Sequence, residues 1–216
     1  MARALLVIDV QNDFCPGGAL EVPRGDEVVP VINRLMPLFE AVVFTQDWHP
    51  ADHLSFASQH AGKPPFTTVE MPYGPQVLWP DHCVQGSRGA DFHPDLDQRP
   101  AQTIVRKGFR REVDSYSAFF ENDRTTPTGL EGWLRSRGID EVWLAGLATD
   151  FCVGYSALDA VRCGFSAFVI EDACRAIDLD GSLAAMRRQW EEAGVRVVTS
   201  ADVPPAIVSR RPGEDQ

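Results

Sequence analysis

The stretch "LAGLATDFCVGYSALDA", residues 144–160, joins the end of an apolar run, a glycine and the start of an amphipathic pattern. The residues up to Leu147 have the composition of a buried strand, and those after Thr149 are typical of a helix. A strand that leads directly into a helix is the repeating unit of α/β folds. Cys152 falls in the first turn of this helix. Because free cysteine is among the most buried residue types, the stretch alone favours a core cysteine over a nucleophile.

The same alternation of strand and helix patterns runs through most of the chain. Apolar runs of strand length lie at residues 4–10, 41–47, 103–108, 142–147, 166–172 and 195–200. Helical patterns lie at residues 25–39, 129–138, 149–164 and 180–194. Runs that are apolar throughout are typical of parallel strands buried on both faces. We therefore expect one α/β domain over residues 1–216, a three-layer α/β/α sandwich with a six-stranded parallel sheet and a mobile tail from about residue 203.

Composition and charge narrow the function classes. The chain has 216 residues, 44% of them hydrophobic, and a net charge of −11, which argues against nucleic acid or an anionic membrane as partner. Its apolar runs are all shorter than the ~18 residues of a membrane span. The five cysteines are odd in number and include no C-x-x-C pair, so we expect free thiols in a cytoplasmic protein. The expected helix faces show no clear interface pattern, so the sequence leaves open whether the chain forms a homo-oligomer.

Reactive side chains fall at the ends of the first four expected strands. Asp9 and Asp47 close the first and second runs, Lys107 closes the third, and Cys152 follows the fourth. The carboxyl ends of parallel strands share one edge of the sheet, where ligands bind in open α/β folds. With Thr149 as N-cap, Cys152 is the third helical residue, and the helix N-terminus lowers the pKa of its thiol. A Lys107 cation would lower this pKa further, and Asp9 is the candidate base.

A second constellation has the character of a metal site. In "TQDWHPADH" Asp47 and His49 are two residues apart, so both side chains can point the same way, and "LWPDHC" supplies His82. One carboxylate and two imidazoles suit one divalent ion, with zinc favoured and iron or manganese as alternatives. His53 either binds the ion or holds a ligand in place from outside it. Scattered histidines in a polar, proline-rich loop are the structural alternative.

Five longer stretches occur in a fixed order along the chain. They read "LLVIDVQNDFCPGGAL", "VVFTQDWHPADHLSF", "LWPDHCVQGSRGADFHP", "VRKGFRREVDSYSAFF" and "VWLAGLATDFCV". Together they resemble the isochorismatase-like cysteine hydrolases, and within that family they are similar to nicotinamidases. The resemblance covers most of residues 4–170. Its most specific parts are the "DWHP…WPDHC" and "KG…DSYSAF" patterns.

This resemblance implies a sheet order of 3-2-1-4-5-6 and a catalytic triad of Asp9, Lys107 and Cys152. It also implies a cis peptide bond between Leu147 and Ala148, with the Ala148 and Cys152 N–H groups as oxyanion donors. The implied metal ligands are Asp47, His49 and His82, completed by water. The implied role of the metal is to bind a pyridine nitrogen, between ring walls supplied by Phe14, Trp79 and Tyr116.

The activity implied is hydrolysis of nicotinamide to nicotinate and ammonia through a Cys152 thioester, with pyrazinamide as a further small-molecule substrate. Three alternatives stay open at this point. One is another small-amide or carbamoyl hydrolase with the same cysteine chemistry. The second is a metal-hydroxide hydrolase in which Cys152 is a bystander. The third is a non-catalytic ligand-binding protein on the same fold.

Overall fold

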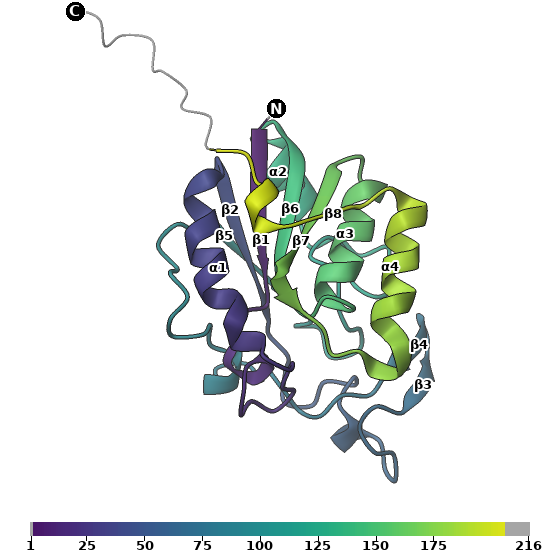
Figure 1. Ribbon diagram of the computed structural model, residues 1–216. Coiled ribbons are helices and arrows are strands. Elements are labelled where there is room, and N and C mark those ends of the chain that lie inside the picture. The colour runs from purple at the N-terminus through teal and green to yellow at the C-terminus, as the bar shows by residue number, and fades with distance from the viewer. Residues whose placement is uncertain (1, 206–216) are drawn as a thin grey trace, which may run out of the picture.

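The computed structural model describes residues 2–205, and its main feature is one six-stranded sheet (Figure 1). The sheet consists of β1 (Ala2–Ile8), β2 (Ala41–Asp47), β5 (Thr103–Lys107), β6 (Ile139–Leu147), β7 (Ser166–Arg175) and β8 (Arg196–Val198). All its strand pairs are parallel, in the order β5-β2-β1-β6-β7-β8. Numbered by their own sequence order, these strands follow 3-2-1-4-5-6. The expected parallel sheet and its order are confirmed.

Helices cover both faces of the sheet, which confirms the three layers. The α-helices are α1 (Val28–Leu35), α2 (Leu130–Arg135), α3 (Cys152–Arg162) and α4 (Ser182–Ala193). Helix α1 packs on one face, and α3 and α4 lie on the other together with α2 (Figure 1). Single 3-10 turns lie at Asn12–Phe14, Gly25–Glu27, Met36–Leu38, Ala57–Gln59, Arg88–Ala90, Leu179–Gly181 and Ser200–Asp202.

The central strand β1 shows why the apolar runs are continuous. Leu5 and Val7 pack in the core on the α1 side, while Leu6 and Ile8 pack in the core on the α3 side. All four are fully buried. Because successive side chains in a strand point to opposite faces, a strand covered by helices on both faces needs an apolar residue at every position.

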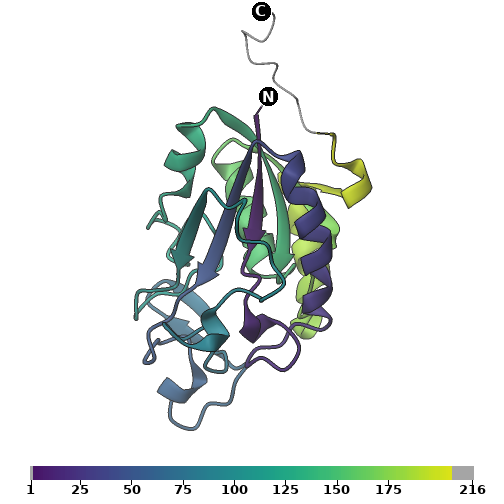
Figure 2. The same ribbon diagram turned by 90° about the vertical axis from the view of Figure 1, so that its left-hand side faces the viewer.

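Two long excursions leave the carboxyl ends of the strands. The first connects β2 to β5 and carries the hairpin β3 (Thr68–Met71) and β4 (Gly74–Val77), which forms its own antiparallel two-stranded sheet. The second connects β5 to α2. Figure 2 shows the blue part of the first excursion below the ends of β1, β2 and β5, before the chain returns to the start of β5. This part of the first excursion therefore covers the carboxyl ends of these strands.

The end of the described chain is packed onto the start of β1. Val203 is buried, and the Arg3 guanidinium donates hydrogen bonds to the carbonyls of Pro204 and Pro205 at 3.2 and 3.1 Å. The remainder of the tail that we expected to be mobile, 206–216, lies outside the described residues. Within 2–205, the helices all lack the length and apolarity needed to cross a membrane.

Candidate active site and metal centre

Strand register places three charged side chains side by side. Asp9 directly follows β1, and Asp47 and Lys107 are the last residues of β2 and β5. Asp47 and Lys107 are also direct partners across the β2–β5 pairing. All three side chains are buried. Neighbouring strands that end level with one another thus create a charged cluster at the rim of the sheet.

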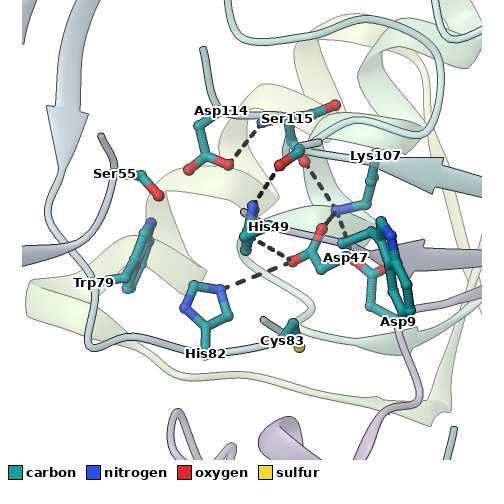
Figure 3. Close-up of polar contacts among 12 residues, drawn as sticks. Asp9, Asp47, His49, Ser55, Trp79, His82, Cys83, Lys107, Asp114 and Ser115 are labelled. Atoms are coloured by element: carbon teal, nitrogen blue, oxygen red, sulfur yellow. Dashed lines mark hydrogen bonds and ion pairs between the residues drawn. The ribbon is translucent and has the colours of Figure 1, made fainter. Parts of the chain in front are cut away.

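The Lys107 ammonium group links the members of this rim cluster. Its Nζ lies 2.8 Å from Asp9 Oδ2 and 3.4 Å from Cys152 Sγ, and it also contacts Asp47 Oδ1. It donates a further hydrogen bond of 2.9 Å to the Ser115 carbonyl (Figure 3). Burial alone would lower the pKa of Lys107, but the carboxylates of Asp47 and Asp9 raise it well above its ordinary value. Lys107 is therefore a permanent cation.

Asp9 has the position and the pKa of a proton acceptor. Burial raises the pKa of its carboxyl to about 6, with Lys107 opposing the rise and Asp47 adding to it. Oδ1 accepts a hydrogen bond of 2.6 Å from the Thr45 hydroxyl. Oδ2 has the ion-pair contact with Lys107, but within the described chain no donor is aligned to hydrogen-bond it. The carboxylate lies within reach of the thiol, because an oxygen of Asp9, an oxygen of Asp47 and Cys152 Sγ lie within 4.8 Å of one another.

Two expectations about Cys152 are wrong. Helix α3 begins at Cys152 itself after Phe151 as N-cap, not after Thr149. The pKa of the thiol lies well above its ordinary value instead of below it. Burial is the main cause, Lys107 opposes it, and Asp9 and Asp47 add to it. The Lys107 cation does not offset the loss of water around a buried thiolate, so the resting thiol keeps its proton and needs a base.

Two backbone N–H groups are free beside the thiol. The peptide bond between Leu147 and Ala148 is cis, as the family resemblance implies. Among the described residues, neither the Ala148 nor the Cys152 amide has a hydrogen-bond acceptor. Both residues line the same cavity. This part of the backbone can therefore bind an oxygen that becomes negative when a carbonyl carbon is attacked.

Asp47, His49 and His82 converge on a second point, on the other side of Asp47 from Lys107. Their candidate ligand atoms lie within 4.8 Å of one another. Asp47 Oδ2 is 3.7 Å from His49 Nε2 and 3.9 Å from His82 Nε2 (Figure 3). The opposite ring nitrogens, Nδ1, lie 2.7 Å from the Gly108 carbonyl and 2.8 Å from the Pro80 carbonyl. A carbonyl only accepts, so each Nδ1 donates and each Nε2 is left to act as a ligand. The donor set and its orientation fit a divalent metal ion.

His53 lies at the edge of this centre. Its Nδ1 accepts a hydrogen bond of 3.2 Å from the Ser55 backbone N–H, and its Nε2 lies 3.3 Å from the Val113 carbonyl. It groups with His49 and Asp114, and not with the set that contains Asp47. The sequence left two roles for His53, and this placement favours support of the centre from outside the ligand set.

A cavity is lined by the Cys152 thiol and by two of the candidate metal ligands, Asp47 and His82. The predicted ring walls Phe14, Trp79 and Tyr116 all line it, with Leu20, Asp47, His82, Asp114, Ala148, Phe151, Cys152 and Ile177. The sequence reasoning assigned no role to Leu20, Asp114, Phe151 or Ile177. Two of these had a local signal, because Phe151 precedes Cys152 and Asp114 begins "DSYSAF". Leu20 and Ile177 had no such signal, because each lies in a loop and lines the cavity only where the fold brings that loop to it.

The aromatic wall is held by a residue that sequence reasoning missed. Trp79 Nε1 donates to the Tyr116 hydroxyl at 3.2 Å, and the Phe151 ring centroid lies 4.9 Å from that of Trp79. Gln76, on β4, is 1% exposed. Its Nε2 lies 2.9 Å from both Asp114 Oδ2 and the Tyr116 hydroxyl. The separate hairpin therefore fixes two groups that face the cavity.

The chain matches one known protein family over most of its length. The family model described as "Isochorismatase domain" matches residues 3–202. The chain belongs to the isochorismatase family. The matched residues include the rim cluster, Cys152 and the whole parallel sheet except Ala2.

Comparison with individual proteins narrows the similarity to nicotinamidases and pyrazinamidases. A nicotinamidase of Acinetobacter baylyi is 54% identical over 200 residues, covering 93% of this chain and 94% of that protein. The structure of an Acinetobacter baumanii nicotinamidase and pyrazinamidase is 56% identical, has a TM-score of 0.92 and covers 94% and 98% of the two chains. A Pyrococcus horikoshii pyrazinamidase, solved in complex with zinc, is 34% identical with a TM-score of 0.74, covering 92% and 99%.

Proposed function

We propose that this protein is a nicotinamidase, which hydrolyses nicotinamide to nicotinate and ammonia and also accepts pyrazinamide. The observation that carries the proposal is the buried Cys152 thiol, which lies beside Asp9 and Lys107 and lines a cavity walled by aromatic rings. The names of the relatives at 54% and 56% identity support the substrate. The free thiols of all five cysteines support a cytoplasmic location.

The first half of the reaction forms a thioester. Asp9 Oδ2 accepts the Cys152 proton as Sγ attacks the carboxamide carbon, and Lys107 balances the negative charge that builds up around it. The Ala148 and Cys152 N–H groups hold the developing oxyanion. One such donor typically contributes about 3 kcal/mol to the transition state. Asp9 then passes its proton to the amide nitrogen, the C–N bond breaks, and ammonia leaves.

The second half returns the enzyme to its resting state. Asp9, again a carboxylate, accepts a proton from water as the water oxygen attacks the thioester carbon. The C–S bond breaks, Asp9 returns the proton to Cys152, and the product leaves as nicotinate after its carboxyl proton is lost to solvent. A carboxyl pKa of about 6 suits a group that must accept and release a proton twice in each turnover.

Asp47, His49 and His82 would hold one divalent ion, zinc by preference and iron or manganese as alternatives. When bound, this ion supplies a Lewis-acid contact for the ring nitrogen of the substrate. Phe14, Trp79 and Tyr116 would enclose the ring between apolar faces and orient the carboxamide toward Cys152. Asp47 contacts Lys107 through Oδ1 and faces the histidines through Oδ2, so it joins the two centres.

The test is ammonia release from nicotinamide by the wild type, Cys152→Ala, and Cys163→Ala as a control. Cys163 is a half-buried free thiol that does not line the cavity. We expect Cys152→Ala to keep its metal and its fold and to lose turnover, and Cys163→Ala to match the wild type. Substantial turnover by Cys152→Ala would assign the reaction to the metal centre instead. Turnover of other small amides but not nicotinamide would leave the thioester chemistry and replace the substrate.

A further inference from the structure

Thr45 is a polar residue in a strand whose side chains are all buried. It lies on β2, is fully buried, and is the direct pairing partner of Val105 on β5. Strand alternation sends its side chain to the same face as that of Asp47, two residues later. A buried hydroxyl at such a position needs hydrogen-bond partners. The reaction described above assigns it no role.

The partners of Thr45 are both on Asp9. Asp9 has a φ of 47°, so its backbone turns away from the β1–β2 pairing just after the strand ends. Its N–H donates to Thr45 Oγ1 at 3.1 Å, and the Thr45 hydroxyl donates to Asp9 Oδ1 at 2.6 Å. These two bonds tie the backbone and the carboxylate of Asp9 to one atom of a central strand.

This arrangement makes the two carboxylate oxygens of Asp9 different. Oδ1 is occupied by Thr45. Oδ2 lies 2.8 Å from Lys107 Nζ as an ion pair, while Lys107 also contacts Asp47, the Ser115 carbonyl and Cys152 Sγ. Within the described residues no donor is aligned to hydrogen-bond Oδ2, so this oxygen, unlike Oδ1, is left to accept a proton.

We propose that Thr45 is a positioning residue for the reaction, whose hydroxyl holds Oδ1 of Asp9 so that Oδ2 faces the Cys152 thiol. The inference rests on the proposed function, in which Asp9 is the base. Without the hydroxyl, the carboxylate is free to rotate and to lose its alignment with the thiol. Misplacing a reacting group by about 1 Å is sufficient to slow a reaction on the order of 100-fold.

The test compares Thr45→Val, which removes the hydroxyl, with Thr45→Ser, which keeps it. The control is Thr126→Val, which removes a hydroxyl bond of 2.6 Å to the Asp123 carboxylate away from the cavity. We expect kcat on nicotinamide to fall about 10–100-fold in Thr45→Val with KM within about twofold of the wild type. Thr45→Ser and Thr126→Val should keep the wild-type kcat. Melting temperatures of all variants report their folding.

A second readout follows the thiol directly. Alkylation of Cys152 by iodoacetamide, measured on its peptide by mass spectrometry, should slow about tenfold or more in Thr45→Val and not in Thr45→Ser. A folded Thr45→Val with wild-type kcat and alkylation rate overturns the proposal. So does a folded Thr45→Ser with a lowered kcat, even where Thr45→Val does not fold. Activity retained by Cys152→Ala would instead overturn the proposed function.

Discussion

The rim and the wall of the cavity are held in place by different means. The rim cluster of Asp9, Asp47 and Lys107 is set by the register of three neighbouring strands, and it is charged and buried. The wall, with Trp79 and Tyr116, comes from the two excursions and is held by side-chain hydrogen bonds. Reacting groups on a rigid sheet and contact groups on loops allow one fold to keep its chemistry while its recognition changes.

The rim should be the more costly region to alter. Lys107→Met keeps much of the side-chain volume but leaves two buried carboxylates without their cation. Breaking a buried ion pair in this way destabilises a protein by about 3–5 kcal/mol, so we expect a loss of that size together with the loss of turnover. Urea unfolding measures it, with exposed Lys63→Met as the control. A change below about 1 kcal/mol would mean that the two carboxylates are protonated or hydrated in the folded protein.

The metal centre joins the two regions, because Asp47 belongs to the rim while His82 arrives on the first excursion. His82→Ala removes one of the three proposed protein ligands. We expect metal affinity to fall by at least about 10–100-fold, the range seen when even a supporting contact is lost. Competition with a chelator and metal analysis measure this without reference to activity. His93→Ala, outside the centre, is the control, and unchanged affinity in His82→Ala would remove His82 from the ligand set.

The same comparison explains what the sequence could predict. Asp9, Asp47 and Lys107 were predictable as neighbours because each closes an apolar run, and the ends of parallel strands meet at one edge. The pKa of Cys152 was not, because its burial comes from the packing of the whole site and not from its place in a helix. The start of α3 was misplaced because Thr149 has the composition of an N-cap, yet its N–H donates to the Arg175 carbonyl on β7.

The roles of Gln76 and Thr45 were also beyond the sequence. Neither belongs to a recognisable pattern, since threonine is enriched in strands generally and a glutamine in a hairpin is ordinarily exposed. Their significance depends on contacts across 38 residues to Asp114 and 36 residues to Asp9. Such contacts become visible only when the excursion is docked and the register of β1 and β2 is fixed.

A change in the wall should affect binding more than chemistry. Gln76→Ala removes the hydrogen bonds that fix the Asp114 carboxylate and the Tyr116 hydroxyl. A hydrogen bond to a charged group is worth about 1.5–3 kcal/mol, so we expect KM for nicotinamide to rise about tenfold while kcat changes little. Steady-state kinetics decide it, with exposed Gln59→Ala as the control. A fall in kcat at constant KM would show that the hairpin supports the rim as well.

A conservative change in the apolar lining of the cavity should show the smallest effect. Ile177 lines the cavity from the loop after β7, and that loop is tied down by Asp150, whose Oδ1 accepts from the Ile177 N–H at 3.1 Å. Ile177→Val removes one CH₂ and leaves this anchor intact. A buried CH₂ is worth about 0.8 kcal/mol, so KM should rise by no more than about fourfold, with kcat unchanged. Steady-state kinetics on nicotinamide and pyrazinamide measure it. A larger rise, or any loss of kcat, would mean that Ile177 also positions the helix that carries Cys152, because Asp150 lies two residues before that thiol.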